Sequence, residues 1–464
     1  MKIRNEKTSY IETLPLILSL AWPTMLEQLM QTMVQYIDIA MIGTLGTAAT
    51  AAVGATTTIN WLVNSSVSAL SIGFLAYISQ ACGAKDNYRS RTIASQSVFV
   101  CITVGLFFTV LTVGLSPVVP DLTQVDPEIR GLAGRYFMIL YLPMLPRTAS
   151  IIFGTALRAA GDTKTPMKLG VYVNLINVVL NYFLIYETRI IELAGNTIIM
   201  PGAGWGVEGA AAASAIAYTV GGLLITRSLW NHPIISPKGF SIMPQWKLLK
   251  PCLKVAVPNM LQRFGTSLGY VVFAAMINSL GEVSTAAHTI ANTVESAFYI
   301  PAYGMQTAAA TLAGNALGAG DQRKMHSFTR MIIIVEVSLM AITGGLLFIF
   351  APAMMSLFSR SSEVILFGAI VLRMVAVSEP FYGVSIIIEG ILQGLGNTVI
   401  PFIFGISGMW LIRIVGTFIC IKLLGMGLVS AWACMIGHNM LLFTAYVVYY
   451  LRGNWNPLNK KVEI

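Results

Sequence analysis

Long apolar runs constrain the fold of this chain more than any other feature. Residues 98–119 contain no charged side chain, and residues 331–351 contain only Glu336. A helix of about 20 apolar residues crosses the hydrocarbon core of a bilayer and satisfies its own backbone hydrogen bonds there. Hydrophobic residues make up 56% of the chain and charged residues 11%, whereas about a quarter of a globular domain is charged. The sequence therefore predicts an all-α integral membrane protein.

Twelve segments have this character, and we expect each to form one transmembrane helix. They lie near residues 14–43, 48–80, 92–117, 129–157, 166–187, 206–228, 247–279, 283–315, 327–351, 362–393, 399–421 and 425–450. The first is too long for the apolar region of a signal peptide and has no cleavage-like flank, so we expect it in the mature protein.

Basic residues are distributed unevenly among the loops. They recur near both termini and in loops around 85–91, 158–168, 227–254 and 323–330, while the opposite loops hold chiefly Arg130, Arg189, Arg360 and Lys422. The positive-inside rule then places both termini in the cytoplasm. Short tails and loops are typical of a prokaryotic inner-membrane protein, so we expect a bacterial plasma membrane. The net charge of +9 follows from this bias, and it indicates no nucleic-acid partner.

The sequence contains an internal repeat, which is the mark of a duplicated architecture. Pro23-Thr-Met-Leu recurs as Pro258-Asn-Met-Leu, an offset of 258 − 23 = 235. The same shift places Gly83-Ala-Lys-Asp on Gly318-Ala-Gly-Asp, and it holds without a gap for residues 23–166. Later the offset becomes 221, so the first half carries 235 − 221 = 14 extra residues in the loop near 187–203.

The duplication predicts two six-helix bundles. Because six is an even number, both halves begin on the same membrane face, related by a pseudo-two-fold axis along the membrane normal with a cavity between them. We expect an N-lobe at residues 1–229, a cytoplasmic linker with Pro and Gly at 230–246 and a C-lobe at 247–464. This geometry suits alternating access, in which one lobe rocks against the other.

A polar stripe runs along the first predicted helix. Its members are Glu27, Gln28, Gln31, Gln35 and Asp38. At about 100° per residue they fall within about 100° of arc, so the stripe faces the lobe interior or the cavity rather than lipid. The offset of 235 puts Phe273 at the place of Asp38, which favours the first half as the place for a bound ion.

The fifth predicted helix offers co-ligands for such an ion. Asn174, Asn177 and Asn181 follow at i, i+3 and i+7, on one face of an apolar run. A carboxylate among amide oxygens suits Na⁺, and it equally suits an Asp that carries a proton. Interhelical hydrogen bonding between asparagines is the structural alternative.

Several segments resemble the multidrug and toxic compound extrusion (MATE) family over about residues 14–450. They are Pro23…Gln31…Asp38-Ile-Ala-Met-Ile-Gly43-Thr-Leu-Gly46, Gln80-Ala-Cys-Gly83-Ala-Lys-Asp86, Leu157-Arg-Ala-Ala-Gly-Asp-Thr163 and Glu295-Ser-Ala-Phe-Tyr-Ile-Pro301…Gly304. The chain looks most similar to prokaryotic members, those of the DinF-like branch before others. The resemblance implies a secondary antiporter that exports amphipathic, often cationic organic compounds in exchange for H⁺ or Na⁺.

The resemblance also implies residue roles. Asp38 matches the acidic residue that binds the coupling ion, Asn177 and Asn181 match a polar pair, and Tyr136 matches a nearby aromatic hydroxyl. Ser214 stands where many members have Thr, and Asn181 where many have Asp. The missing carboxylate weakens the case for Na⁺. Pro23 matches a proline at which the first helix bends, which we assign as a hinge.

The second half has its own intramembrane charges, which are Arg263, Glu295, Glu336, Arg373, Glu379, Glu389 and Arg413. We expect Glu379 and Glu389 to meet Arg263 or Arg373 as buried pairs, with substrate binding as the alternative. Acidic residues beside Tyr299 suit a bulky organic cation through charge and cation–π contact. The substrate-cavity candidates are thus Gln31, Gln35, Glu27, Glu295, Tyr299 and Glu389.

Other functional classes find little support. The five cysteines and four histidines show no metal-ligand spacing, so we expect no metal beyond a possible Na⁺ at Asp38. No catalytic motif is present, and we expect neither an enzyme nor a cofactor other than the coupling ion. The partners expected are small organic substrates and the bilayer, for a monomer. The runner-up function is a lipid-linked saccharide flippase of the same superfamily, although such proteins usually have more spans and several cavity arginines.

Overall fold

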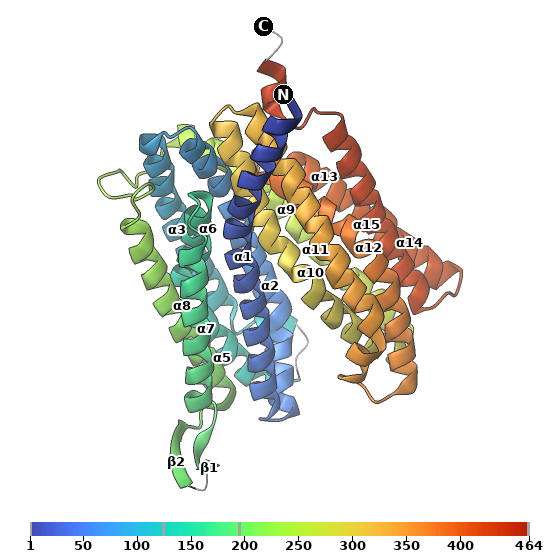
Figure 1. Cartoon of the computed structure of the whole chain (residues 1–464). Coiled ribbons are helices and arrows are strands. Elements are labelled where there is room, and N and C mark those ends of the chain that lie inside the picture. The colour runs from blue at the N-terminus through green and yellow to red at the C-terminus, as the bar shows by residue number, and fades with distance from the viewer. Residues whose placement is uncertain (1, 123–125, 194–195, 462–464) are drawn as a thin grey trace.

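A computed structural model describes residues 2–122, 126–193 and 196–461 (Figure 1). Helices of the first half are α1 (Lys2–Gly43), α2 (Thr47–Gly83), α3 (Asn87–Leu115), the short α4 (Val119–Leu122), α5 (Arg130–Tyr141), α6 (Met144–Ala159), α7 (Lys164–Leu184) and α8 (Gly206–Trp230). The two halves of the sequence form two bundles that stand side by side, with both termini at the same end of the molecule.

The second half repeats this arrangement. Its helices are α9 (Trp246–Asn278), α10 (Glu282–Gly318), α11 (Gln322–Ser356), α12 (Ser362–Gly394), α13 (Val399–Ser407), α14 (Val415–Phe418) and α15 (Leu428–Leu451). Two π-helical stretches, η1 (Gly408–Ile414) and η2 (Ile419–Leu423), join α13 and α14 into one span, and a 3₁₀ turn, η3 (Pro457–Lys461), ends the described chain. Each of the twelve predicted spans corresponds to one of these helical columns.

The twelve helical segments differ in how well their length and hydropathy suit a membrane crossing. In the described part of the chain, nine helices are long and apolar enough to cross a bilayer, and α5 with α6, bent by 49°, makes a tenth. The remaining two columns are α1 and α10, which are long but carry polar stripes. These two helices pack against each other between the bundles.

A β-hairpin extends the first half beyond its helices. Strand β1 (Glu187–Leu193) pairs antiparallel with β2 (Asn196–Ala203), with Ile190 opposite Ile199, and the hairpin projects at the end opposite the termini (Figure 1). It accounts for the 14 extra residues of the repeat, which the sequence analysis had placed in a loop. A strand pair needs only this length to satisfy its backbone outside the membrane.

The contacts where α2 crosses α10 follow the internal sequence repeat. A Cβ added to Gly83 would collide with the backbone of Asn315, and one added to Gly318 would collide with the backbone of Gln80. Gly83 with Gly318, and Gln80 with Asn315, are both related by the offset of 235. The two contacts are therefore the same contact made twice.

Ser79 and Gly314 complete this crossing. The Ser79 side chain occupies the place where a Cβ on Gly314 would lie, and these residues are again related by the offset of 235. Two equivalent residues can touch only beside the axis that relates them. The pseudo-two-fold axis therefore passes between Ser79 and Gly314.

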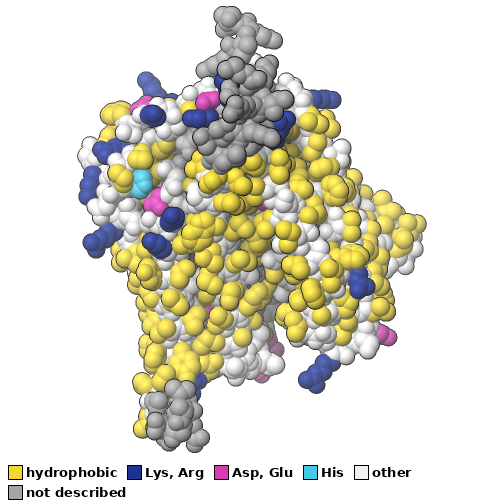
Figure 2. Space-filling model, in the orientation of Figure 1, with side chains coloured by type: hydrophobic (Ala, Val, Ile, Leu, Met, Phe, Trp, Pro, Cys, Tyr) yellow, Lys and Arg dark blue, Asp and Glu magenta, His cyan; other side chains and the backbone are white. Residues whose placement is uncertain are grey.

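The halves meet near the end that carries the termini. Side-chain hydrogen bonds join Thr24 Oγ1 to the Gly304 carbonyl at 2.9 Å, Gln80 Nε2 to that of Gly394 at 3.0 Å and Thr311 Oγ1 to that of Arg158 at 3.3 Å. Figure 2 shows Lys and Arg side chains gathered toward this end and the outline notched at the opposite end. The bundles are thus packed together at the Lys/Arg-rich end and apart at the other.

The segment between the halves follows the surface of α3. Gln96 Nε2 donates to the Met243 carbonyl at 3.0 Å, and Gln96 Oε1 accepts from the Gln245 amide at 2.8 Å. These bonds fix the linker at the Lys/Arg-rich end. The exact lobe boundaries, at 229 and 247, stay predictions.

Candidate functional site

Asp38 lies at the centre of a polar network between α1, α7 and α8. Asn181 Nδ2 donates to Asp38 Oδ1 at 2.5 Å and to Asn177 Oδ1 at 3.2 Å. Asn177 Nδ2 in turn donates to Ser214 Oγ at 3.0 Å. The structure thus brings together four of the predicted ion-site residues, from three helices.

The oxygen atoms of this network fit a monovalent cation. Asn181 is fully buried, and its Oδ1 has no hydrogen-bond partner. An unpartnered buried acceptor beside a half-buried carboxylate is an available ligand for Na⁺ or for a carboxylic-acid proton. Within the described residues, no group of three His, Cys, Asp or Glu side chains could hold a metal ion, so the site has one carboxylate and neutral oxygens.

The remaining first-half candidates lie around this network. Tyr136 is half-buried and packs on the cores of α5 and α8. Asn174, one turn before Asn177, has a buried Nδ2 without a partner and does not reach Asp38 by a hydrogen bond. Gln31 and Gln35 are exposed, as expected for side chains that face a water-filled space. Their roles stay predictions.

Glu27 forms an ion pair that the sequence analysis missed. Arg158 Nη2 lies 2.5 Å from Glu27 Oε1, and the two side chains are 17% and 10% exposed respectively. Arg158 was seen only as part of a loop motif. The repeat held a signal, because the equivalent residues Gln262 and Gln393 differ from Glu27 and Arg158 together, as coupled partners do.

Pro23 lies inside the continuous helix α1. It has no amide hydrogen, so the carbonyl of Ser19 loses its helical partner. Thr163 Oγ1 lies 3.5 Å from that carbonyl, at the long end of hydrogen-bond distance. In the second half the equivalent Thr398 Oγ1 donates at 2.6 Å to the carbonyl of Val255, one residue after Lys254, the equivalent of Ser19. A helix bent here could keep its backbone satisfied, and the hinge stays a prediction.

A second buried network of the first half surrounds Arg147. Its guanidinium donates to Asn60 Oδ1 at 2.9 Å, and Tyr141 OH donates to the same oxygen at 2.8 Å. The Arg147 guanidinium also lies 4.6 Å from the ring centre of Tyr218. Cation–π contact therefore takes the place of a carboxylate partner. The sequence analysis did not single out Arg147, although its position inside the predicted span 129–157 was itself a signal of a functional or buried polar site.

Glu389 differs from the prediction. It accepts from Gln262 Nε2 at 3.2 Å and from Gln393 Nε2 at 3.0 Å. Among the described residues neither Arg263 nor Arg373 makes an ion pair with it or with Glu379, and Arg373 Nε instead lies 3.3 Å from a backbone carbonyl. The expected buried pairs were wrong: amide donors from α9 and from the next turn of α12 satisfy Glu389, and neither oxygen of Glu379 has a hydrogen-bond partner.

The other second-half candidates lie within the C-lobe and differ in burial. Glu295 is 6% exposed, and the Tyr299 ring lies 6.0 Å from that of Tyr303 and 6.2 Å from that of Tyr382. Glu379 is buried, with both oxygens unpartnered. Glu295 therefore lies in the interior of the bundle, and Tyr299 is half-buried among the rings of Tyr303 and Tyr382.

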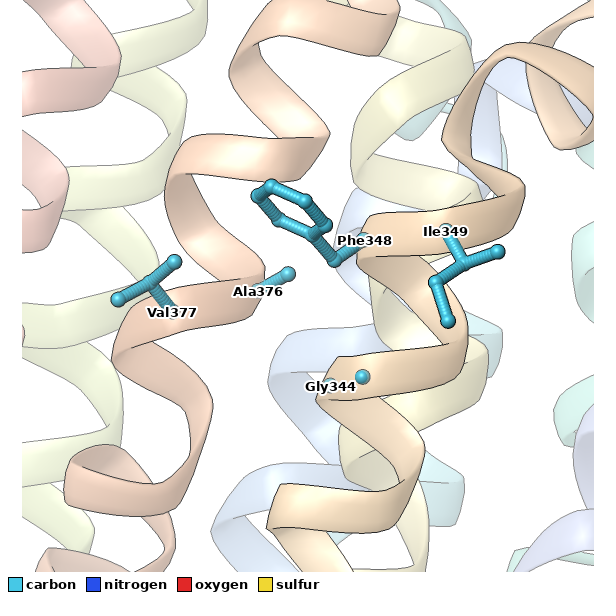
Figure 3. A pocket seen from close by; sticks show the side chains of 6 residues that line it. Gly344, Phe348, Ile349, Ala376 and Val377 are labelled. Carbon is cyan, nitrogen blue, oxygen red and sulfur yellow. The ribbon is translucent and has the colours of Figure 1, made fainter.

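The surface of the C-lobe has an apolar hollow. It has a volume of about 390 Å³ and lies between α11 and α12, where Phe348, Ile349 and Val377 surround Gly344 and Ala376 (Figure 3). Ile349 and Val377 are 65% and 64% exposed, so this hollow faces the position of lipid. It holds none of the candidate site residues.

Comparison with known proteins gives a family match over most of the chain. A family model described as MatE matches residues 23–183 and again 258–419. The chain is 27% identical to a probable multidrug resistance protein NorM of Thermotoga maritima, over 95% of this chain and 92% of that one. It is 25% identical to the probable multidrug resistance protein YpnP of Bacillus subtilis, over 95% of each.

Solved structures share the fold. One is a MOP superfamily transporter from Pyrococcus furiosus, with a TM-score of 0.86 and 21% identity over 96% of each chain. Another is a multidrug resistance MATE family transporter of the MOP superfamily in an outward-facing conformation, with the same TM-score, identity and coverage. At this identity the likeness shows the two-bundle architecture alone.

Proposed function

This chain belongs to the MATE family of membrane transporters, and from that membership we propose that it is a multidrug exporter driven by an inward gradient of H⁺ or Na⁺. Its substrates are amphipathic, often cationic organic compounds, as the names of its relatives from Thermotoga maritima and Bacillus subtilis suggest. The flippase alternative gains nothing from these relatives, all of them named for multidrug resistance.

One observation carries the ion coupling. Asp38 accepts a hydrogen bond from Asn181 at 2.5 Å, in a half whose buried acid, Glu27, is neutralised by Arg158. A carboxylate that has amide neighbours and no cationic partner within the network binds a positive ion when the surroundings are dry. We assign Asn177, Asn181 and Ser214 as its supporting residues, with Tyr136 and Asn174 in the surrounding shell.

Alternating access follows from the arrangement of the halves. They are packed together at the Lys/Arg-rich end, which we assign to the cytoplasm, so the described state is open on the opposite side. Coupling requires that ion and substrate favour different states. Asp38 binds the ion in the N-lobe, and the space that Gln31 and Gln35 face receives the substrate, with Pro23 as the bending point of α1. The protein acts as a monomer in the plasma membrane.

Proteoliposomes test this proposal. The purified chain is reconstituted into liposomes that contain ethidium, and a Na⁺ gradient and a pH gradient are imposed in separate experiments. Export that is driven by one gradient and abolished by dissipating it is expected. Equal ethidium movement with and without any gradient, in liposomes of verified tightness, contradicts ion coupling. Movement of an undecaprenyl-linked saccharide without ethidium export would favour the flippase.

A further inference from the structure

The register of α10 against α12 places two acids at the same depth. Gly390 packs on Gln306, with 2.6 Å between the Gly390 Cβ position and the Gln306 carbonyl oxygen. The difference in number is 390 − 306 = 84, and Glu379 and Glu295 differ by the same 84. Because the two helices run parallel, Glu295 and Glu379 lie level with each other on neighbouring helices.

The register of α11 against α12 brings a third acid to this depth. Glu336 Oε1 lies 3.0 Å from the position that a Cβ on Gly383 would take, one turn along α12 from Glu379. The Cβ of Glu379 lies 3.4 Å from the corresponding position on Gly344. All three acids are near the middle of their helices, so the cluster lies near the bilayer midplane.

Two of these carboxyl groups are fully buried and have no hydrogen-bond partner. Glu336 is 0% exposed and Glu379 1% exposed, and none of their four oxygen atoms has a hydrogen-bond partner. A carboxylate that leaves water without a counter-charge or a donor is strongly disfavoured against its protonated form. The protonated carboxylic acid is neutral and avoids this desolvation penalty.

The charges that face the cluster cannot balance three carboxylates. On one side is Arg413, 4% exposed, whose guanidinium lies 4.8 Å from the Tyr270 ring centre and 4.4 Å from that of Phe273. Arg413 lies within electrostatic reach of Glu295. The other titratable and charged groups around it are Tyr299, Tyr303, Tyr382, His288, His438, Glu389 and Arg263. Two further permanent cations lie on these helices: Arg263, within electrostatic reach of Glu389, and Arg373, which is exposed and directs its Nε to the Phe348 carbonyl.

We propose that Glu295, Glu336 and Glu379 form a second proton-binding site, in which Glu336 and Glu379 hold the protons and Glu295 balances Arg413. The ligand is H⁺ rather than a metal ion, because no three acidic side chains of the described chain converge closely enough to hold one. The site is separate from Asp38, whose repeat-equivalent position is Phe273.

A lipid-soluble reagent can approach the three acids through the hollow shown in Figure 3. Gly344 and Ala376 form part of its floor, and the Glu379 side chain begins directly behind Gly344. An apolar reagent that reacts only with protonated carboxyl groups can therefore approach from the membrane side. N,N′-Dicyclohexylcarbodiimide has both properties: it takes the acid's proton and adds the carboxylate to its central carbon.

Infrared spectroscopy and carbodiimide labelling of the full chain in liposomes test the proposal at pH 7. The C=O stretch of protonated carboxylic acids is expected to weaken in Glu336→Gln and in Glu379→Gln, and the carbodiimide is expected to label Glu379 and Glu336 of the native chain. The matched control is Glu363→Gln, at the exposed first turn of α12, which should change neither signal.

An unchanged acid band in both variants, together with no labelling of either residue in the native chain, overturns the proposal. Labelling of the native chain needs no variant, so the test stays decisive if a substitution prevents folding. Asp38→Asn is expected to keep both signals. A failure of ion-driven export would therefore leave this site untouched, and the two proposals can fail separately.

Discussion

Arg158 Nη2 lies 2.5 Å from Glu27 Oε1 in the first half, whereas the second half has Gln262 and Gln393 at these places and puts its acid on Glu389 instead. Both Gln side chains donate to Glu389. Glu389 is the repeat-equivalent of Gly154, so the carboxylate has moved from one helix of the bundle to another. The first half thus satisfies the buried Glu27 by charge, and the second half satisfies the half-buried Glu389 by amide donors.

This difference predicts the effect of breaking the ion pair. Arg158→Gln leaves Glu27 buried without its counter-charge and should destabilise the protein by about 3 kcal/mol or more. Glu27→Gln combined with Arg158→Gln should recover most of the loss, because it recreates the Gln262–Gln393 composition. Thermal unfolding in detergent measures both. Arg135→Gln, which breaks the more exposed Arg135–Glu208 pair, is the control and should cost less than about 1 kcal/mol.

Asp38→Asn should abolish gradient-driven ethidium export while leaving insertion and folding intact. The new amide oxygen can still accept the Asn181 hydrogen bond, but it can no longer carry a negative charge. Export assays in proteoliposomes measure the loss. Asp86→Asn is the control, since Asp86 caps α3 by accepting from the Arg89 amide at 2.9 Å and lies outside the span. Undiminished export by Asp38→Asn would refute the ion-site assignment.

Asn181→Asp should increase the response to Na⁺. A second carboxylate beside Asp38 adds a negative charge, which strengthens the binding of a hard cation. The expected outcome is a rise in thermal stability on adding Na⁺ that is larger than in the native chain, with choline as the ionic-strength control. Asn174→Asp, on the same face but outside the hydrogen-bonded network, should give a smaller response. Equal responses from the two variants would contradict the network.

Gly318→Ala should loosen the Lys/Arg-rich end. The added methyl group meets the backbone of Gln80 on the other half, and backbone cannot move aside as a flexible side chain can. Spin labels at Asn87 and Arg323, in a cysteine-free background, should show a longer or broader distance distribution. Gly345→Ala adds the same methyl group where nothing lies within 4 Å and should leave the distances unchanged.

His232 should make the linker sensitive to pH. Its Nδ1 accepts from the amides of Ile234 and Ile235 at 3.2 and 3.3 Å, which requires the neutral ring. Burial lowers the pKa of His232 from 6.5, and nearby Asp162 acts in the opposite direction. The two hydrogen bonds to His232 therefore stabilise the linker above pH 6.5. This stabilisation is lost as the pH falls below 6.5 and passes through the lower pKa of His232 in the folded state.

Amide hydrogen exchange at Ile234 and Ile235, corrected for the intrinsic effect of pH, should show this loss of protection. His232→Asn keeps an acceptor that does not titrate, and its protection should not depend on pH in the same range. A native chain whose corrected protection is constant from pH 7 to pH 5 would exclude the mechanism.

The sequence predicted the helices well because hydrocarbon leaves the backbone few choices. An apolar run such as 98–119 must become largely helical in a bilayer, and α3 covers it as far as Leu115. The repeat predicted the axis between the bundles because its offset fixed which residues are equivalent. The Asp38–Asn181–Asn177–Ser214 network was predicted from spacing and resemblance together, and the structure brings these side chains within hydrogen-bond distance.

Partners between distant helices could not be predicted in this way. The Arg158–Glu27 pair joins residues 131 apart, and Arg147 meets Asn60 across 87, so helical periodicity says nothing of either contact. The π-helical stretch around Arg413 leaves no mark in hydropathy, because it changes which side chains share a face without changing their composition. The hairpin at β1 and β2 was hidden in a segment whose length was its clearest signal.

A half-length ancestor pairing with its own copy would have set position 79 of one chain against position 79 of the other. On such an axis one codon supplies both partners, so only a residue small enough to fit beside itself is tolerated. Fusing two copies into one gene lifts that restriction. In this chain position 79 is Ser and the equivalent position 314 is Gly, so the Ser79 side chain fills the place of a missing Cβ, a tighter fit than a homodimer encoded by a single gene could reach.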